Sequence, residues 1–107
     1  MPQADLSYSA HLDIDAAAIL ATVEQIISAH DDRAGDCKGR AFPVADTHHT
    51  HALLRLRMLR KPHRNEAFMQ TLLEALQTAL NPMFPAPCII GVELGFLEPY
   101  YGSVTHV

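Results

Sequence analysis

The sequence predicts an α+β fold made of two tandem β-α-β units, which together form a four-stranded sheet with both helices on one face. Two observations lead to this prediction. Segments of alternating apolar residues enclose segments with helical apolar spacing, and this order occurs twice, at about 2–47 and 51–99, before a tail at 100–107. A chain of 107 residues, of which 49% are hydrophobic, is expected to form a single domain over 1–107 without a deep internal cleft.

The first unit starts with a strand-like segment at 5–12. Asp13 or Asp15 can then cap a helix, because short acidic side chains accept hydrogen bonds from the free N–H groups of a first helical turn. A second extended segment follows at 37–44, where Pro43 indicates an edge, bent or terminating strand. The residues expected to form the inner stripe of this helix, at helical spacing between the two strands, are Ile19, Val23, Ile26, Ile27 and His30.

The second unit repeats this pattern more clearly. Residues alternate between an apolar and a basic face in the segment 51–59, and the last extended segment lies at 88–97. Pro62 and Asn65 introduce the helix between them, which ends at Asn81, where Pro82 follows. The apolar stripe of this helix contains Phe68, Met69, Leu72, Leu73, Leu76 and Leu80.

The second face of the predicted sheet is expected to be uncovered. Connections between parallel strands are almost always right-handed, so both helices should pack on the same side if the two units lie side by side. The residues expected on the other side are Arg55, Arg57, Gly91, Glu93 and Gly95. A bare sheet face of mixed polarity favours oligomerisation, with the bare faces turned toward one another around a central axis.

Charge and composition argue against several classes of function. The net charge of −4 disfavours non-specific binding of nucleic acid. No apolar segment is long enough to cross a bilayer, and the amino terminus lacks the pattern of a secretion signal, so a cytoplasmic protein without a membrane partner is expected. Cys37 and Cys88 show neither metal-ligand spacing nor a disulfide pattern and are expected to be packing residues.

The basic residues are nevertheless concentrated in one part of the chain. Seven of the eight lie between positions 38 and 64, namely Lys38, Arg40, Arg55, Arg57, Arg60, Lys61 and Arg64. Two interpretations remain open at this point. The cluster is either a solvated basic face or a pocket for a small polycarboxylate, since guanidinium groups bind carboxylates in a bidentate manner.

A histidine-rich segment follows the first unit, with His48, His49 and His51 in close succession. Histidine is a common zinc ligand, so a metal site is one interpretation. Adjacent histidines point in different directions, however, and no fourth ligand is evident. A solvated turn is therefore favoured, and no metal is expected.

Pro2 is the candidate catalytic residue. Removal of Met1 would leave a secondary amine at the start of the first strand. An ordinary α-amino group titrates at roughly pH 7.7–8.0, so desolvation or nearby cations would leave an amine neutral and able to act as a base. The alternative is structural, because proline is also common at the start of an edge strand.

A proline-initiated chain of two tandem β-α-β units resembles the tautomerase superfamily, and within it the 5-carboxymethyl-2-hydroxymuconate delta-isomerase family. The resemblance extends over nearly the whole chain and is clearest at about 35–99. It is carried by the order and spacing of Lys38-Gly39-Arg40, Val44-Ala45-Asp46-Thr47, Met58, Arg64, Gly91-Val92-Glu93-Leu94 and Glu98-Pro99. The resemblance implies homotrimers with sites between neighbouring subunits, Pro2 as general base and then acid, and Lys38, Arg40 and Arg64 as ligands of the substrate carboxylates.

The implied reaction converts a 2-hydroxymuconate-type dienol carboxylate into its 2-oxo-ene isomer, without a metal or an organic cofactor. Such substrates belong to the breakdown of aromatic compounds. Two alternatives are kept beside this interpretation. One is a non-catalytic trimeric homologue that binds a small di- or tricarboxylate, and the other is an interaction module that contacts a neighbouring subunit or partner through the tail at 100–107.

Overall fold

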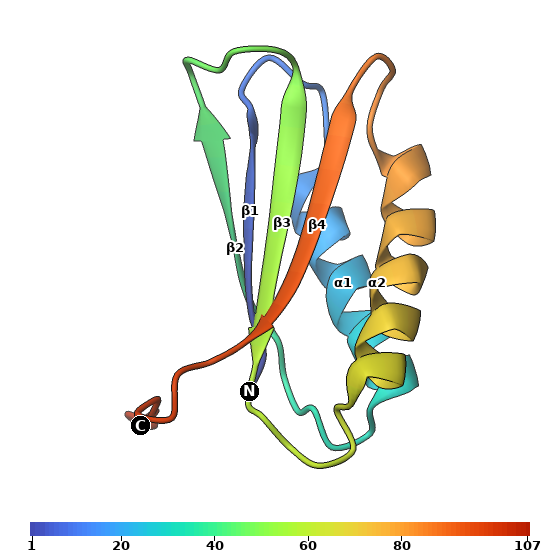
Figure 1. Ribbon diagram of the computed structural model, residues 1–107. Helices are drawn as coiled ribbons and strands as arrows, with labels where there is room; N and C mark the ends of the chain where they lie inside the picture. The colour runs from blue at the N-terminus through green and yellow to red at the C-terminus, as the bar shows by residue number, and fades with distance from the viewer.

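Two β-α-β units follow one another in the computed structural model, which describes residues 1–107 (Figure 1). The first consists of β1 (Gln3–Ser9), α1 (Ala16–His30) and β2 (Lys38–Val44). The second consists of β3 (His51–Met58), α2 (Glu66–Leu80), a short 3-10 turn (Asn81–Met83) and β4 (Ile89–Phe96). The predicted fold class is confirmed, although β1 begins and ends earlier than the segment 5–12 expected from the sequence.

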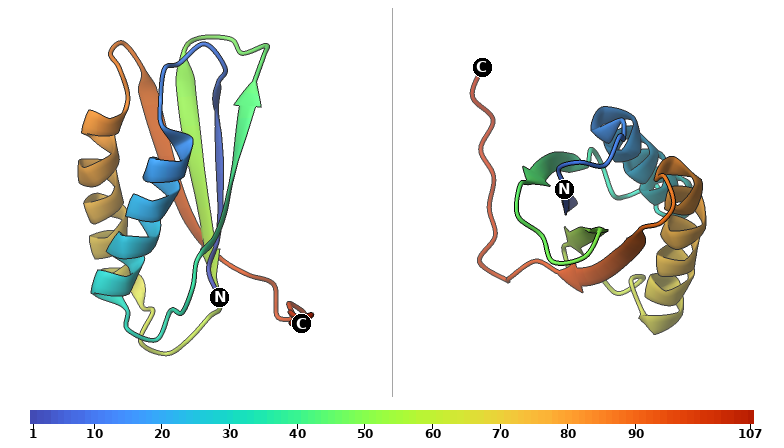
Figure 2. Two further views of the ribbon diagram at one scale, coloured as in Figure 1. Left: turned by 180° about the vertical axis from the view of Figure 1, so that it is seen from behind. Right: turned by 90° about the horizontal axis from the view of Figure 1, so that it is seen from above.

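The four strands form one sheet in the order β2-β1-β3-β4. The outer pairs, β1 with β2 and β3 with β4, are parallel, and the central strands β1 and β3 are antiparallel. Figure 2 shows both helices packed on the same side of this sheet, as the right-handed crossovers require. The other side of the sheet carries no covering element of the chain.

Both helices begin at a side-chain cap. The Asp15 carboxylate accepts a hydrogen bond from the Ala18 N–H over 3.0 Å, which decides between the two expected capping residues. In α2, the Asn65 side chain accepts from the Phe68 N–H over 2.9 Å. Each cap satisfies one of the N–H groups that a helix start leaves free. No helix of the structure has the length and apolar character needed to cross a membrane.

The hydrophobic core lies between the sheet and the two helices. It is built from alternate residues of the central strands and from the inner stripe of each helix. Its fully buried members include Ala4, Leu6, Ile19, Val23, Ile27, Leu54, Leu56, Met58, Leu72, Leu76 and Leu80. A Cβ added to Gly39 would come within 3.1 Å of the Leu20 side chain, so this glycine lets α1 pack closely on β2.

The uncovered side of the sheet, called the open face below, is crossed by a row of alternating charges. The register places Arg40, Asp5, Arg55 and Glu93 side by side on β2, β1, β3 and β4. Arg40 Nη1 lies 2.6 Å from Asp5 Oδ1, and Arg55 Nε lies 2.9 Å from Glu93 Oε1. The neighbouring row toward the histidine-rich turn is mainly apolar and includes Phe42, which is 47% exposed.

Candidate active site

Pro2 lies immediately before β1, and its ring is fully buried. Its carbonyl oxygen accepts a hydrogen bond from the Lys38 N–H over 2.8 Å, so the first residue of β2 is held directly beside it. The preceding Met1 is partly exposed. While Met1 is attached, the Pro2 nitrogen is part of a tertiary amide and cannot accept a proton as an amine does. The buried position therefore becomes a candidate base only after Met1 is removed.

Lys38 and Arg40 lie on β2 beside the start of β1, and both point to the open face. They alternate with Gly39, which faces α1, and the register places them opposite Gln3 and Asp5. The Arg40 guanidinium bonds to the Asp5 carboxylate and to the Gln3 side-chain oxygen, and Nη2 also lies 3.4 Å from the Lys38 carbonyl oxygen. The structure thus places Lys38 and Arg40 at the same end of the sheet as Pro2, with a backbone hydrogen bond between Pro2 and Lys38.

Arg64, the third expected ligand of the substrate, is placed differently. Its side chain is only 2% exposed, and Nε donates to Asp31 Oδ2 over 2.8 Å. A second donor, Nη1, bonds to the Leu59 carbonyl oxygen over 2.6 Å. The guanidinium is therefore committed to a buried ion pair, and the expectation that Arg64 binds substrate does not agree with its position in this structure.

The buried Asp31 carboxylate explains why Arg64 is held so firmly. Burial alone would raise the pKa of Asp31, but hydrogen bonds from His63 and Arg64, a backbone hydrogen bond from Arg33 and the charge of Arg64 outweigh burial and lower it to about 2. His63 Nε2 lies 3.0 Å from the same Oδ2 atom. Sequence reasoning missed this pair because its two residues are 33 positions apart.

Two further side chains near Pro2 were not expected from the sequence. Gln3 Nε2 donates a hydrogen bond to the Tyr101 hydroxyl over 3.0 Å, although the two residues are 98 positions apart. Tyr101 belongs to the tail after β4, and its N–H bonds to the Glu98 carbonyl oxygen over 3.1 Å. The only signal in the sequence was the polar alternation of the first strand, which puts Gln3 on the open face.

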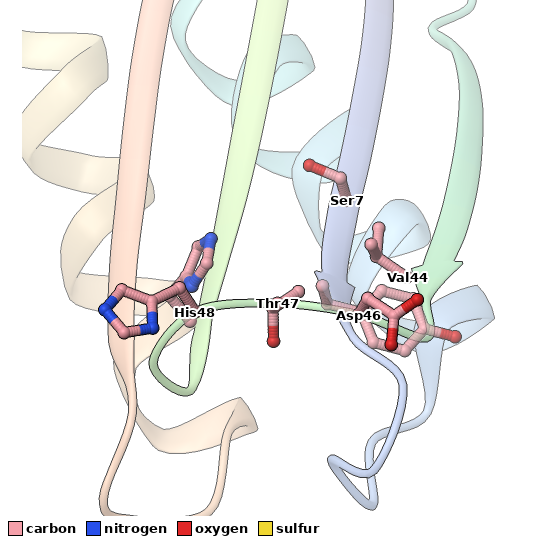
Figure 3. Close-up of a pocket in the computed structure, with 7 residues that line it drawn as sticks. Ser7, Val44, Asp46, Thr47 and His48 are labelled. Carbon is pink, nitrogen blue, oxygen red and sulfur yellow. The ribbon is translucent and has the colours of Figure 1, made fainter.

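A separate hollow of about 330 Å³ lies at the opposite end of the sheet. Figure 3 shows Asp46 and His48 on either side of Thr47 at its edge. The other lining residues are Ser7, Tyr8, Val44 and His51. No group of three or more His, Cys, Asp or Glu side chains is placed to hold a metal ion. The exposed His48 and His49 agree with a solvated turn.

No hollow of the single subunit provides a binding pocket next to Pro2. None of them is lined by Pro2, Lys38 or Arg40. A hollow of about 500 Å³ lies beyond the ends of β3 and β4, where the Arg60 guanidinium stacks 4.1 Å from the centre of the Phe96 ring. A small ligand next to Pro2 would therefore need a further wall from outside this subunit.

No protein-family model matches the chain, and no curated protein matches it. Several solved structures have the same fold as this chain. A 5-carboxymethyl-2-hydroxymuconate delta-isomerase has 18% sequence identity and a TM-score of 0.79 over 99% of this chain and 89% of its own. A 5-carboxymethyl-2-hydroxymuconate isomerase from Deinococcus radiodurans R1 has 17% identity and a TM-score of 0.76 over 99% and 90%. A fused 4-OT protein in a symmetric trimer has 14% identity and a TM-score of 0.71 over 96% and 93%.

These similarities confirm the tautomerase-like fold that the sequence resemblance implied. The alignments cover nearly all of both chains, so the whole β-α-β repeat is shared, including the strand that starts after Pro2. At 14–18% identity the likeness concerns the fold, and the chemistry has to be argued from the residues of this chain.

Proposed function

We propose that this chain is a cofactor-independent isomerase or tautomerase that converts a 2-hydroxymuconate-type dienol carboxylate into its 2-oxo-ene isomer. The observation that carries the proposal is the burial of Pro2 at one end of the sheet, with Lys38 and Arg40 on the adjacent strand. The names of two structures with the same fold identify them as isomerases of such a muconate, which supports this substrate class.

In the proposed mechanism, loss of Met1 turns the Pro2 nitrogen into a secondary amine. The amine takes the proton from the enol oxygen of the substrate and returns it, as the ammonium acid, to a carbon further along the conjugated system. Lys38 and Arg40 bind the substrate carboxylate and stabilise the negative charge that develops on the 2-oxo oxygen. The same cations disfavour the protonated amine and so keep Pro2 available as a base.

The proposal includes a homotrimer. The open face exposes Phe42 and Ile89, the latter to 73%, and the Pro2 end lacks a wall within the subunit. The 4-OT protein with the same fold forms a symmetric trimer, which supports this assembly. A neighbouring subunit packed against the open face would cover the exposed apolar side chains and close the site beside Pro2.

The test begins with the intact mass of the protein from its native host, which shows whether Met1 is removed. Ultraviolet absorbance then follows the conversion of 2-hydroxymuconate and related dienols by the processed protein. We expect Pro2→Ala to abolish turnover and Arg40→Ala to raise KM or lower kcat without unfolding the protein. Retention of Met1 in the native host, or wild-type rates in Pro2→Ala, would exclude the mechanism.

A specific observation favours the non-catalytic alternative as the second candidate. Arg40 is already paired with Asp5, and Arg64 with Asp31, so two of the three expected cations are partly or fully neutralised within the subunit. With this reduced positive charge, Lys38 and the half-exposed Arg40 would still bind a small dicarboxylate, but they would not stabilise the negative charge that conversion develops on the 2-oxo oxygen. Binding measured by calorimetry, together with an unchanged absorbance spectrum of a bound dienol, would identify this outcome.

A further inference from the structure

We propose that Gln3 and Tyr101 are positioning residues that hold the Arg40 guanidinium toward the Pro2 end of the sheet, so that the tail after β4 takes part in the site. This inference rests on the proposed function, because it gives Arg40 a ligand to bind. Its basis is a continuous set of side-chain hydrogen bonds that joins the two ends of the chain.

The hydrogen bonds run in one direction across the open face. The Tyr101 hydroxyl accepts from Gln3 Nε2, and Gln3 Oε1 in turn accepts from Arg40 Nη2. A glutamine amide has one acceptor oxygen and one donor nitrogen, so a bond at each end fixes its orientation. A guanidinium has donors only, so Arg40 takes the oxygen end of the Gln3 amide, and the bond from Gln3 Nε2 to the Tyr101 hydroxyl holds the amide in that position.

The Arg40 guanidinium is held between two opposing partners. Asp5, further along β1, holds Nη1 on the side of the sheet centre, whereas Gln3, next to Pro2, holds Nη2 on the other side. Nη2 also lies 3.4 Å from the carbonyl oxygen of Lys38, the residue whose N–H bonds to Pro2. Loss of the Gln3 contact would leave Asp5 as the remaining side-chain partner and move the guanidinium away from Pro2.

The conformation of the tail after β4 places the Tyr101 hydroxyl next to the Gln3 side chain. A turn closed by the bond from the Tyr101 N–H to the Glu98 carbonyl oxygen follows β4 directly. Tyr101 is half-buried, while its neighbour Tyr100 is fully exposed. Figure 1 shows the tail leaving β4 on the same end of the sheet as the amino terminus. Tyr100 is therefore a matched control, with the same side chain in the same segment.

The experiment compares Tyr101→Phe with Tyr100→Phe in the protein from which Met1 has been removed. We expect Tyr101→Phe and Gln3→Met each to weaken binding of trans,trans-muconate, an unreactive dicarboxylate, by about threefold to tenfold, the effect of one hydrogen bond. Tyr100→Phe should leave the affinity unchanged. In turnover, KM should rise more than kcat falls, because binding through Arg40 is what changes.

Double variants separate a positioning role of Tyr101 from a general effect on the structure. If Tyr101 acts through Gln3 and Arg40, Tyr101→Phe should have no further effect on muconate binding in Arg40→Ala or in Gln3→Met. An equal loss of affinity in those backgrounds would overturn the proposal.

The side-chain NMR signal of Arg40 Nε gives a readout that needs neither ligand nor activity. It should shift in Tyr101→Phe and Gln3→Met and stay in place in Tyr100→Phe. A shifted signal in a protein that binds no muconate and converts no dienol would refute the proposed function and retain the positioning of Arg40. An unshifted signal would refute the positioning itself.

Discussion

Arg64 Nε donates to Asp31 Oδ2 over 2.8 Å, and this buried ion pair joins the end of α1 to the loop that precedes α2. The two side chains are 2% and 1% exposed, so neither charge is hydrated. A buried pair of this kind is costly to form and more costly to break, because the remaining partner keeps its charge without compensation. Arg64 is thus part of the framework beneath the candidate site.

The first prediction concerns the removal of this arginine. Arg64→Ala should lower the free energy of unfolding by about 3–5 kcal/mol, since it leaves the Asp31 carboxylate buried without its guanidinium partner and with His63 as the remaining side-chain contact. Arg33→Ala is the control, because Arg33 is an exposed arginine whose backbone N–H alone contacts Asp31. Urea unfolding measures both. A stable Arg64→Ala protein with weakened muconate binding would restore Arg64 as a substrate ligand.

The second prediction is that the free energy of unfolding falls as the pH is lowered, because Asp31 becomes protonated. The pKa of Asp31 is about 2 in the folded protein and near 3.8 when unfolded, so the unfolded state binds a proton first as pH falls. The contribution of this carboxylate is complete above about pH 5 and is lost between about pH 4 and 2, at most about 2 kcal/mol. Urea unfolding across this range should show a flatter acid limb in Asp31→Asn. Parallel profiles would contradict the assignment.

The third prediction concerns the partner of Arg40. The Asp5 and Arg40 side chains are 50% and 43% exposed, and a half-exposed ion pair contributes up to about 1 kcal/mol. Asp5→Asn should therefore free the guanidinium and strengthen trans,trans-muconate binding by about twofold to fivefold in calorimetry. Glu93→Gln removes the equivalent charge beside Arg55, two strands from β1, and serves as control. An equal gain in both variants would indicate a general charge effect.

The fourth prediction tests the open face as the surface of assembly. Phe42 and Ile89 lie on the two edge strands and are 47% and 73% exposed in the subunit. If the chain forms the proposed trimer, Phe42→Glu and Ile89→Glu should each shift it toward monomer in light scattering, because a charge would be buried against a neighbour. Thr78→Glu, on the exposed surface of α2, should not. A trimer that tolerates both open-face changes would place the interface elsewhere.

The fold was largely predictable because its signals are local. The alternation of Leu54, Leu56 and Met58 with arginines, and the broad stripe of the second helix, each specify an element and its buried face within a few residues. The N-cap at Asp15 was one of two expected alternatives, and only the structure decides between them.

The site was less predictable, since its decisive contacts are distant in the sequence. Whether Arg64 is free or paired depends on Asp31 at the end of α1, and the environment of Arg40 depends on strand register and on Tyr101 in the tail. A count of basic residues contains no information on which carboxylates neutralise them. The expected ligands therefore differ in their surroundings: Lys38 and Arg40 lie on β2 at the Pro2 end of the sheet, and Arg64 forms a buried ion pair with Asp31.

Because β1 and β3 are antiparallel and each begins a β-α-β unit, the backbone at the start of β3 has the same arrangement as the backbone at the start of β1, at the opposite end of the sheet. The bond from the Lys38 N–H to the Pro2 carbonyl oxygen is matched by one from the Ile89 N–H to the Thr50 carbonyl oxygen at the other end. A chain has only one amino terminus, so only one of these twin positions can carry a free amine. A circular permutant that starts at position 50 and carries Thr50→Pro would have its terminal secondary amine at the histidine-rich end of the sheet. The backbone geometry at that end is the same, but Lys38 and Arg40 lie at the other end.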